Sequence, residues 1–366
     1  MSFSFGFSSK DFSDDETDND GLATGLEAVS AVSSVNPLDD VRLLAKEIVQ
    51  PQWEDLKTVL DSLKDVRVSF EQISTPRNST VLYRRDLFDV KHQLMSEAGD
   101  EDEDSVELDI LMGETSEDLR KNVYEGGLKS WECSIDVVDY LSGLNHGLED
   151  IDCVLELGCG TALPTEYVYS KFLQLQPAKD VNFILSDYNK SVLRLVTIPN
   201  LIITWAKVVL SEEQYCQLQR CNDETIPVRS DELLLTDQLL QAFYHDMQTR
   251  RITINLMSGT WGRSFTNLLA PKLSAHSGIL AITSETIYQP ENLPVVAETL
   301  LDIILTNKNS KVKALVAAKD IYFGVGGSII EFDKYLKNRI QQDLLPITYN
   351  AQKVDASLKR SIVFIE

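Results

Sequence analysis

The spacing of apolar and polar residues changes near residue 123. Before that point, residues 38–49, 53–63 and 86–95 carry apolar side chains at helical spacing, while residues 66–70 alternate as a short strand does. After that point, short apolar runs alternate with longer amphipathic segments. The change divides the chain into an N-terminal extension and a larger region with a regular plan.

Six short apolar runs in the larger region have the length and composition of buried strands. They lie at residues 154–157, 183–186, 252–257, 278–283, 314–318 and 361–365. Helical spacing is found at residues 131–144, 293–305 and 328–343. Alternating strands and helices predict an α/β, Rossmann-like fold with a mostly parallel sheet covered on both faces. The last strand is free to pair antiparallel.

These patterns set the expected domain boundaries. Residues 1–36 are rich in Ser, Asp and Gly and are expected to form a disordered acidic tail. Residues 37–122 form an N-terminal extension with helices and an acidic linker at 97–107. The α/β domain covers residues 123–366, with a helical insertion near 211–250.

Composition narrows the function classes. The formal net charge of -23 repels phosphate backbones, so we expect no direct binding to nucleic acid. The same charge attracts basic proteins, and we expect the partner to be one of them. The five cysteines and four histidines show no metal-ligand spacing, and we expect no metal. The N-terminus lacks the features of a signal peptide, and no continuous apolar run reaches membrane-spanning length.

The strongest chemical signal follows the first predicted strand of the α/β domain. Glu156 lies near the end of that strand, and Gly158 and Gly160 form a tight Gly-x-Gly turn into a helix. A dinucleotide fingerprint requires Gly or Ala where Leu163 stands, which disfavours a pyrophosphate ligand. The Glu156 carboxylate instead suits a cationic amino group, such as the methionine part of S-adenosylmethionine.

Polar residues also end the next two strands. Asp187, followed by Tyr188 and Asn189, is placed to accept both ribose hydroxyls of a nucleoside, although an N-cap role suits the same position. Gly259, Thr260 and Trp261 follow the third strand, where Trp261 either stacks on an adenine or packs in the core.

Two further segments are candidates for the site. A Gly126-Gly127 turn precedes Trp131, Glu132, Cys133 and Ser134 at a helix start, which suggests a loop folded over a cofactor or a plain helix entry. Ser284, Glu285 and Tyr288 end the fourth strand, where they face the reacting atoms or belong to a surface loop. Glu285 and Tyr288 are the candidates for holding a substrate side chain.

Taken together, these segments resemble the protein-histidine methyltransferases, within them the group that includes methyltransferase-like protein 18. The segments that carry the resemblance are 126–134, 155–160, 187–189, 259–261, 284–288 and 324–328. The Glu285-x-x-Tyr288 spacing also resembles a motif shared by a wider group of protein methyltransferases, many of which act on lysine.

The resemblance implies a seven-strand S-adenosylmethionine-dependent methyltransferase fold. It implies transfer of a methyl group to the tele nitrogen of a histidine of large-subunit ribosomal protein L-3, with S-adenosylhomocysteine as the product. Residues 131–134, Gly158, 187–189, 259–261 and Ser284 would line the cofactor site. Relatives often carry an acidic residue where this chain has Thr260, which puts a side-chain contact to the adenine amino group in doubt.

Two other functions remain open at this point. The chain is alternatively a protein-lysine methyltransferase acting on a translation factor, or a non-catalytic ribosome-assembly factor that keeps the fold as a scaffold. For the histidine reaction, Glu285 is the candidate for holding the imidazole. We expect a monomer with no membrane contact, located in the cytoplasm with access to the nucleus.

Overall fold

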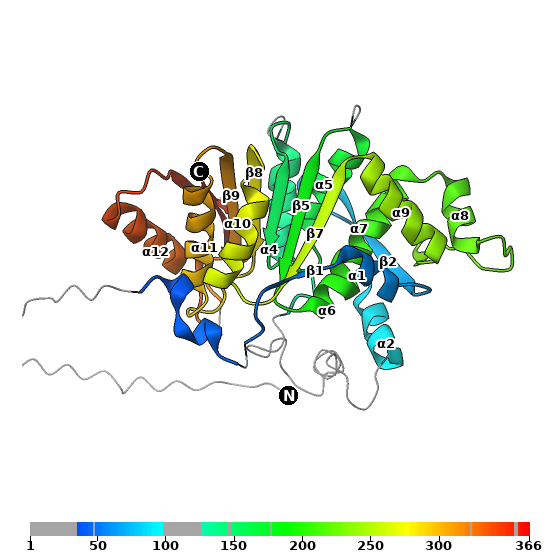
Figure 1. The fold of residues 1–366 in the computed structure, drawn as a ribbon, viewed down its shortest axis with the longest axis horizontal. Helices are drawn as coiled ribbons and strands as arrows, with labels where there is room; N and C mark the ends of the chain where they lie inside the picture. The colour runs from blue at the N-terminus through cyan, green and yellow to red at the C-terminus, as the bar shows by residue number, and fades with distance from the viewer. Residues whose placement is uncertain are drawn as a thin grey trace, which may run out of the picture. The chain divides into compact units, whose positions relative to one another are not determined.

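The predicted strands of the α/β domain lie side by side in one sheet (Figure 1). The computed structural model describes residues 35–46, 48–97, 126–144, 148–175, 178–322, 324–354 and 358–366. Residues 36–366 form one compact unit. The parallel strands are β4 (Cys153–Leu157), β5 (Val181–Asp187), β7 (Ile252–Ser258), β8 (Gly278–Ser284) and β9 (Lys311–Lys319).

Three further strands complete this sheet. They are β1 (Gln52–Glu54), which is antiparallel to β7, β11 (Arg360–Ile365), which is antiparallel to β9, and β10 (Tyr349–Val354), which is antiparallel to β11 and so runs in the same direction as β9. In the described residues the strand order is β1-β7-β5-β4-β8-β9-β11-β10. Seven of these strands form the expected seven-strand sheet, its last strand β11 pairs antiparallel, and β1 adds an eighth strand from the N-terminal extension.

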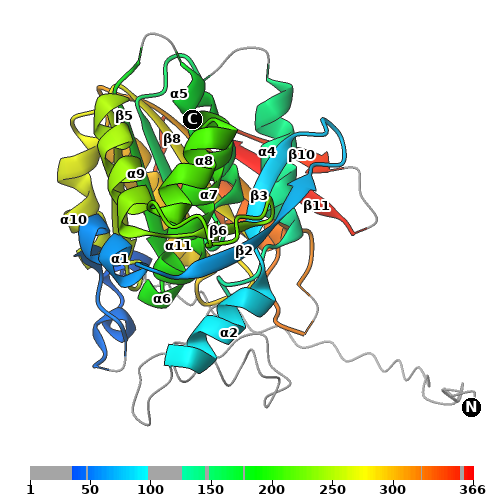
Figure 2. The same cartoon turned by 90° about the vertical axis from the view of Figure 1, so that its right-hand side faces the viewer.

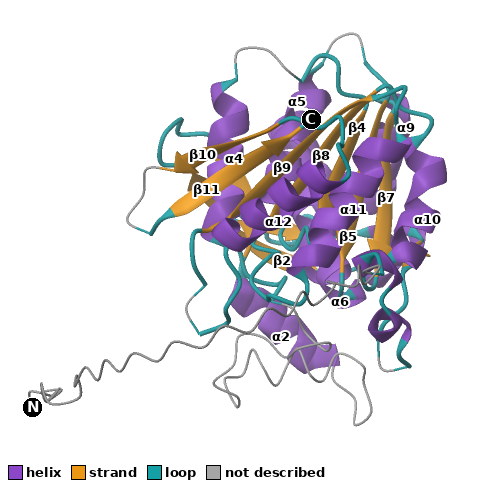
Figure 3. Cartoon of the chain, turned by 90° about the vertical axis from the view of Figure 1, so that its left-hand side faces the viewer, coloured by secondary structure: helices purple, strands orange, loops and turns teal. Residues whose placement is uncertain are grey.

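Helices cover both faces of the sheet, as the near-continuous apolar runs of its strands require (Figure 3). On one face, a core is formed with α1 (Leu56–Ser62), α4 (Glu132–Gly143), α5 (Leu163–Gln174), α7 (Ile198–Val209) and α9 (Asp237–Thr249). On the other face, the core is formed with α10 (Arg263–Leu273), α11 (Leu293–Thr306) and α12 (Ile329–Gln342). With both faces covered, the carboxyl ends of the strands are where an open α/β sheet is expected to bind a ligand.

The N-terminal extension and the predicted insertion share a second sheet (Figure 2). β2 (Arg67–Ser74) pairs antiparallel with β3 (Val81–Arg85) on one side and with β6 (Glu232–Leu234) on the other. α2 (Leu87–Glu97) follows β3, and α8 (Glu212–Arg220) precedes β6. The extension is therefore built into the compact unit through shared strands.

A long apolar helical run crosses the core between β5 and the insertion. It consists of α6 (Lys190–Val192), a π-helical turn η3 (Leu193–Thr197) and α7. Pro199 lacks an N–H, which leaves the Leu195 carbonyl free to accept a 2.8 Å hydrogen bond from Arg85 Nη1. Lys190–Val209 has the length and composition of a membrane span, but 78% of its apolar window is buried here, as in a core helix.

The segment before β1 differs from its predicted helix. Among the residues that the structure describes here, 37–46 and 48–49, the helical elements are two short 3-10 turns, η1 (Pro37–Asp39) and η2 (Val41–Leu44). The helix expected at 53–63 begins at Leu56, because Asp55 caps it and Trp53 pairs with Met257 in the sheet. Most of the acidic linker and nearly all of the N-terminal tail lie outside the described residues.

Candidate functional site

A pocket opens at the carboxyl ends of the central strands, where open α/β sheets bind ligands. The parallel registers bring Leu157, Asp187 and Ser258 to the same edge. Most of the predicted site residues line this pocket. They are Trp131, Ser134, Gly158, Gly160, Asp187, Tyr188, Thr260, Trp261, Ser284, Glu285 and Tyr288.

The glycine turn after β4 forms the floor of the pocket. Gly158 and Gly160 have φ values of 64° and 51°, in the left-handed region that favours glycine. A Cβ on Gly158 would lie 2.6 Å from Thr286 Cγ2, and one on Gly160 would lie 2.9 Å from the Gly127 carbonyl oxygen. The two glycines therefore let the Thr286 side chain and the Gly127 backbone approach the end of β4 closely.

Asp187 holds this turn in place. Its Oδ2 accepts a 2.9 Å hydrogen bond from the Gly160 amide, and its Oδ1 accepts one of 3.2 Å from the Asn189 amide. The carboxylate is 4% exposed and lines the pocket. A carboxylate at this strand end is placed where a ribose would lie in a nucleoside site of an open α/β sheet. Asn189 takes part through its backbone and does not line the pocket.

Glu156 occupies a different place from the one expected. Its side chain is fully buried, and Oε2 accepts hydrogen bonds from the amide (3.1 Å) and the hydroxyl (2.5 Å) of Thr165 in the first turn of α5. Burial raises the pKa of Glu156 to about 8, so the group carries little negative charge at neutral pH. Glu156 therefore supports the start of α5 and does not line the pocket to receive a cationic amino group.

Trp261 forms a flat wall beside the glycine turn. Its ring carbons lie 3.4–3.5 Å from the position of a Cβ on Gly158. Its Nε1 is buried and has no hydrogen-bond partner, although a buried indole N–H usually finds one. An aromatic face, a glycine turn without room for side chains and a buried carboxylate fit a nucleoside ligand such as the adenosyl group expected from the sequence.

Glu285 lies on another wall of the pocket in a constrained position. It directly follows β8 with φ 59°, an unusual value for a residue with a side chain. Its Oε2 accepts a 2.5 Å hydrogen bond from the Tyr322 hydroxyl, and Lys319 Nζ lies 3.9 Å from Oε1. Burial and the adjacent carboxylate raise the pKa of Tyr322, which keeps the phenol protonated and able to donate. Glu285 is thus held rigidly at the pocket surface.

Three further predicted residues support the pocket from outside its lining. Cys133 is buried and donates its backbone N–H to Glu285 Oε1 at 3.4 Å. Glu132 forms an ion pair with Lys319, at 3.2 Å. Gly259 leaves room for the backbone of the N-terminal extension, since a Cβ there would lie 2.6 Å from the Gln50 carbonyl oxygen.

Several lining residues have no clear sequence signal. Leu43 and Ile48 come from the N-terminal extension, far from any motif, and only the fold brings them to the pocket. Tyr322 holds Glu285 from outside the lining, and the sequence analysis assigned it no role. Thr161 and Thr286 also line the pocket; Thr161 directly follows the glycine turn and Thr286 lies within residues 284–288, but neither was named as a site residue.

Comparison with known proteins gives close relatives. Histidine protein methyltransferase 1 of Saccharomyces cerevisiae is 54% identical over 372 residues, covering 100% of this chain and 98% of that protein. The protein of the same name from Schizosaccharomyces pombe is 34% identical over 82% of this chain and 80% of its own length. No family model matches the chain.

A homologue from Rattus norvegicus is 29% identical over 67% of this chain and 58% of its own length. A solved putative class I S-adenosylmethionine-dependent methyltransferase from Listeria monocytogenes is 14% identical over 77% of this chain, with a TM-score of 0.33. That likeness is too distant to bear on function, whereas the two fungal relatives align along most of the chain. The chain therefore belongs to the histidine protein methyltransferase 1 family and is an S-adenosylmethionine-dependent methyltransferase.

Proposed function

We propose that this enzyme methylates the tele nitrogen of a histidine in large-subunit ribosomal protein L-3. The observation that carries the proposal is the fixed Glu285 carboxylate in the same pocket as the nucleoside-type wall formed by Asp187 and Trp261. This arrangement offers a site for the methyl donor and, beside it, one acceptor for an N–H of the protein substrate.

For a histidine substrate, one hydrogen-bond acceptor is sufficient to prepare the side chain for methylation. An imidazole has an ordinary pKa of about 6.5, so it is mostly neutral at pH 7 and already nucleophilic. When bound, S-adenosylmethionine supplies a methyl group activated by the positive sulfur. The enzyme has to select one ring nitrogen, and a hydrogen bond from the pros N–H to Glu285 leaves the tele lone pair free to attack.

Glu285 has a second effect as the reaction proceeds. The imidazole ring becomes positively charged on methylation, and a nearby carboxylate stabilises that charge. Because Tyr322 holds Glu285 before the substrate arrives, little reorganisation is required. Tyr288 lines the same pocket, with its ring centroid 6.4 Å from that of Tyr322, and extends the wall against which the substrate side chain lies.

The proposed partner agrees with the charge of the chain. A net charge of -23 attracts a basic ribosomal protein and accelerates its encounter with the enzyme, an effect that salt weakens. We propose that the enzyme acts as a monomer in the cytoplasm, with access to the nucleus, where ribosomal proteins assemble.

The test is transfer of a labelled methyl group from S-adenosylmethionine to purified L-3 and to large ribosomal subunits, followed by hydrolysis and amino-acid analysis. The proposal predicts label in tele-methylhistidine only. Label in methyllysine or in pros-methylhistidine would contradict the proposal. The proposal would also be contradicted if no label were transferred although the S-adenosylmethionine was intact. A matched reaction with the Glu285→Gln variant should show much slower transfer at unchanged binding of S-adenosylhomocysteine.

A further inference from the structure

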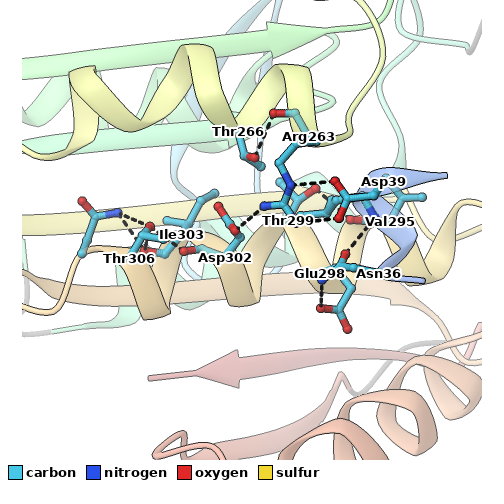
Figure 4. A network of polar contacts seen from close by, with 12 residues as sticks. Asn36, Asp39, Arg263, Thr266, Val295, Glu298, Thr299, Asp302, Ile303 and Thr306 are labelled. Atoms are coloured by element: carbon cyan, nitrogen blue, oxygen red, sulfur yellow. Dashed lines mark hydrogen bonds and ion pairs between the residues drawn. The ribbon is translucent and has the colours of Figure 1, made fainter. Parts of the chain in front are cut away.

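The segment before α1 forms an N-terminal arm, defined as residues 36–46 and 48–54, that lies along the carboxyl edge of the sheet. Its first part is fastened by polar contacts (Figure 4). Asn36 Nδ2 donates to Glu298 Oε2 at 3.4 Å. Asp39 accepts hydrogen bonds from Arg263 Nε and Nη2 at 2.9 and 3.1 Å, while Arg263 Nη1 contacts Asp302 at 2.9 Å.

The second part of the N-terminal arm is fastened through backbone contacts. The Thr260 amide donates a 2.9 Å hydrogen bond to the Val49 carbonyl, and β1 pairs antiparallel with β7. Two glycines flank Thr260 and Trp261 and make the approach possible. A Cβ on Gly259 would meet the Gln50 backbone at 2.6 Å, and one on Gly262 would meet Leu43 Cδ1 at 2.9 Å.

Between these fastenings, two apolar side chains of the N-terminal arm enter the pocket lining. Leu43 and Ile48 are half-buried there. Val41, on the same turn as Leu43, is 79% exposed. The neighbouring Val49 contacts Thr260 and also donates its amide to the Tyr188 hydroxyl at 3.4 Å. The two side chains therefore lie at the β5–β7 end of the pocket, where Tyr188, Thr260 and Trp261 also lie.

We propose that Leu43 and Ile48 form an apolar wall of the adenine subsite, so that the N-terminal arm is part of the cofactor-binding site. An adenine ring has two flat faces that gain from apolar contact. Trp261 offers one flat surface, and the arm supplies an apolar surface at the same end of the pocket. The proposal rests on the placement of the cofactor in this pocket and is independent of the identity of the acceptor.

The first test is calorimetric titration of S-adenosylhomocysteine into the full chain and its variants. Replacing Leu43 and Ile48 together by Ala removes apolar contact area, and we expect binding about tenfold weaker than in the wild type. Val41→Ala is the matched control in the same arm and should bind like the wild type. A double variant that binds within twofold of the wild type would overturn the proposal.

The second test needs no substitution. Trypsin cleaves after Arg42, whose side chain is 72% exposed, and after Lys46, once the arm opens from its fastenings. Saturation of the wild type with S-adenosylhomocysteine should slow cleavage at these two positions several-fold, and equal rates with and without ligand would overturn the proposal. A wild type that takes up no ligand by calorimetry would instead refute the cofactor placement on which the proposed function depends.

Discussion

The Tyr322 hydroxyl donates a 2.5 Å hydrogen bond to Glu285 Oε2 and thereby joins the segment after β9 to the end of β8. We predict that Tyr322→Phe lowers the turnover number about tenfold and leaves the affinity for S-adenosylhomocysteine unchanged, because the carboxylate loses one fixed partner. Steady-state kinetics and calorimetry check this. Tyr215→Phe, which removes a hydroxyl that contacts the Glu232 carbonyl far from the pocket, is the control.

A larger effect is expected when the carboxylate itself is changed. Glu285→Gln keeps the size of the side chain but removes the charge that stabilises the imidazolium, and we predict a loss of turnover of about a hundredfold. Single-turnover measurements at saturating cofactor separate this loss from binding. An unchanged rate would remove Glu285 from the reaction.

Asp187 supports the glycine turn through two backbone amides, which makes it sensitive to a conservative change. Asp187→Asn turns one acceptor into an NH₂ group that faces an N–H of Gly160 or Asn189, and we predict at least tenfold weaker binding of S-adenosylhomocysteine. Asp180→Asn serves as the control, because Asp180 is an exposed carboxylate directly before β5, at the strand end opposite to Asp187. Equal affinities in the two variants would contradict the assignment of Asp187 to the site.

The ion pairs of Arg263 fasten the N-terminal arm at a partly exposed site. Arg263→Ala should therefore cost less than about 1 kcal/mol of unfolding free energy, since exposed ion pairs contribute little. The variant should nevertheless bind S-adenosylhomocysteine a few-fold more weakly than the wild type. Its affinity for this ligand should also change less with salt concentration than the affinity of the wild type does. Arg229→Ala removes a comparable exposed pair with Glu232 and provides the comparison. Identical salt dependence in both variants would contradict this role of the arm.

Two fully buried carboxyl groups predict a pH effect on stability. Burial raises the pKa of Glu156 and of Glu166 to about 8, above the ordinary value of 4.5. Between about pH 4.5 and 8 the folded state holds protons that the unfolded state has lost, so stability falls as pH rises through this window, by at most about 1.4 kcal/mol per pH unit for each group.

Glu156→Gln and Glu166→Gln remove these titrations. Thermal or urea unfolding of wild type and variants should therefore show a difference that shifts in favour of the variants from pH 5 to pH 8. A difference that stays constant across this range would show that the two groups titrate alike in the folded and unfolded chain. Glu166 contacts the Tyr83 amide and the Thr204 hydroxyl away from the pocket, which makes it the matched partner for Glu156.

The central strands were predictable because their residues are apolar on both faces. The runs at β4, β5 and β8 are buried nearly throughout, and most residues of β7 and β9 are buried as well, which is the pattern that a covered parallel sheet requires. The edge strand β10 was not found, since Tyr349–Val354 is mostly exposed and polar. The helix expected at 38–49 did not form because its apolar side chains do not share one buried face, as exposed Val41 and Leu44 show.

The candidate site was predictable where a local turn determines it. Gly158, Gly160 and Asp187 lie together because strand ends of a parallel sheet meet at one edge. Glu156 was misplaced by the sequence analysis, since alternation along β4 does not reveal that its carboxylate turns toward Thr165. Leu43, Ile48 and Tyr322 depend on contacts between distant segments, which no local pattern encodes.

A crystal structure of the full chain with S-adenosylhomocysteine tests most directly whether this pocket holds the methyl donor. The account predicts ribose hydroxyls within hydrogen-bond distance of Asp187, adenine between Trp261 and the Leu43–Ile48 surface, and the sulfur end open toward Glu285. Ligand bound elsewhere on the chain, or in this pocket with its adenine beside Glu285, would contradict it.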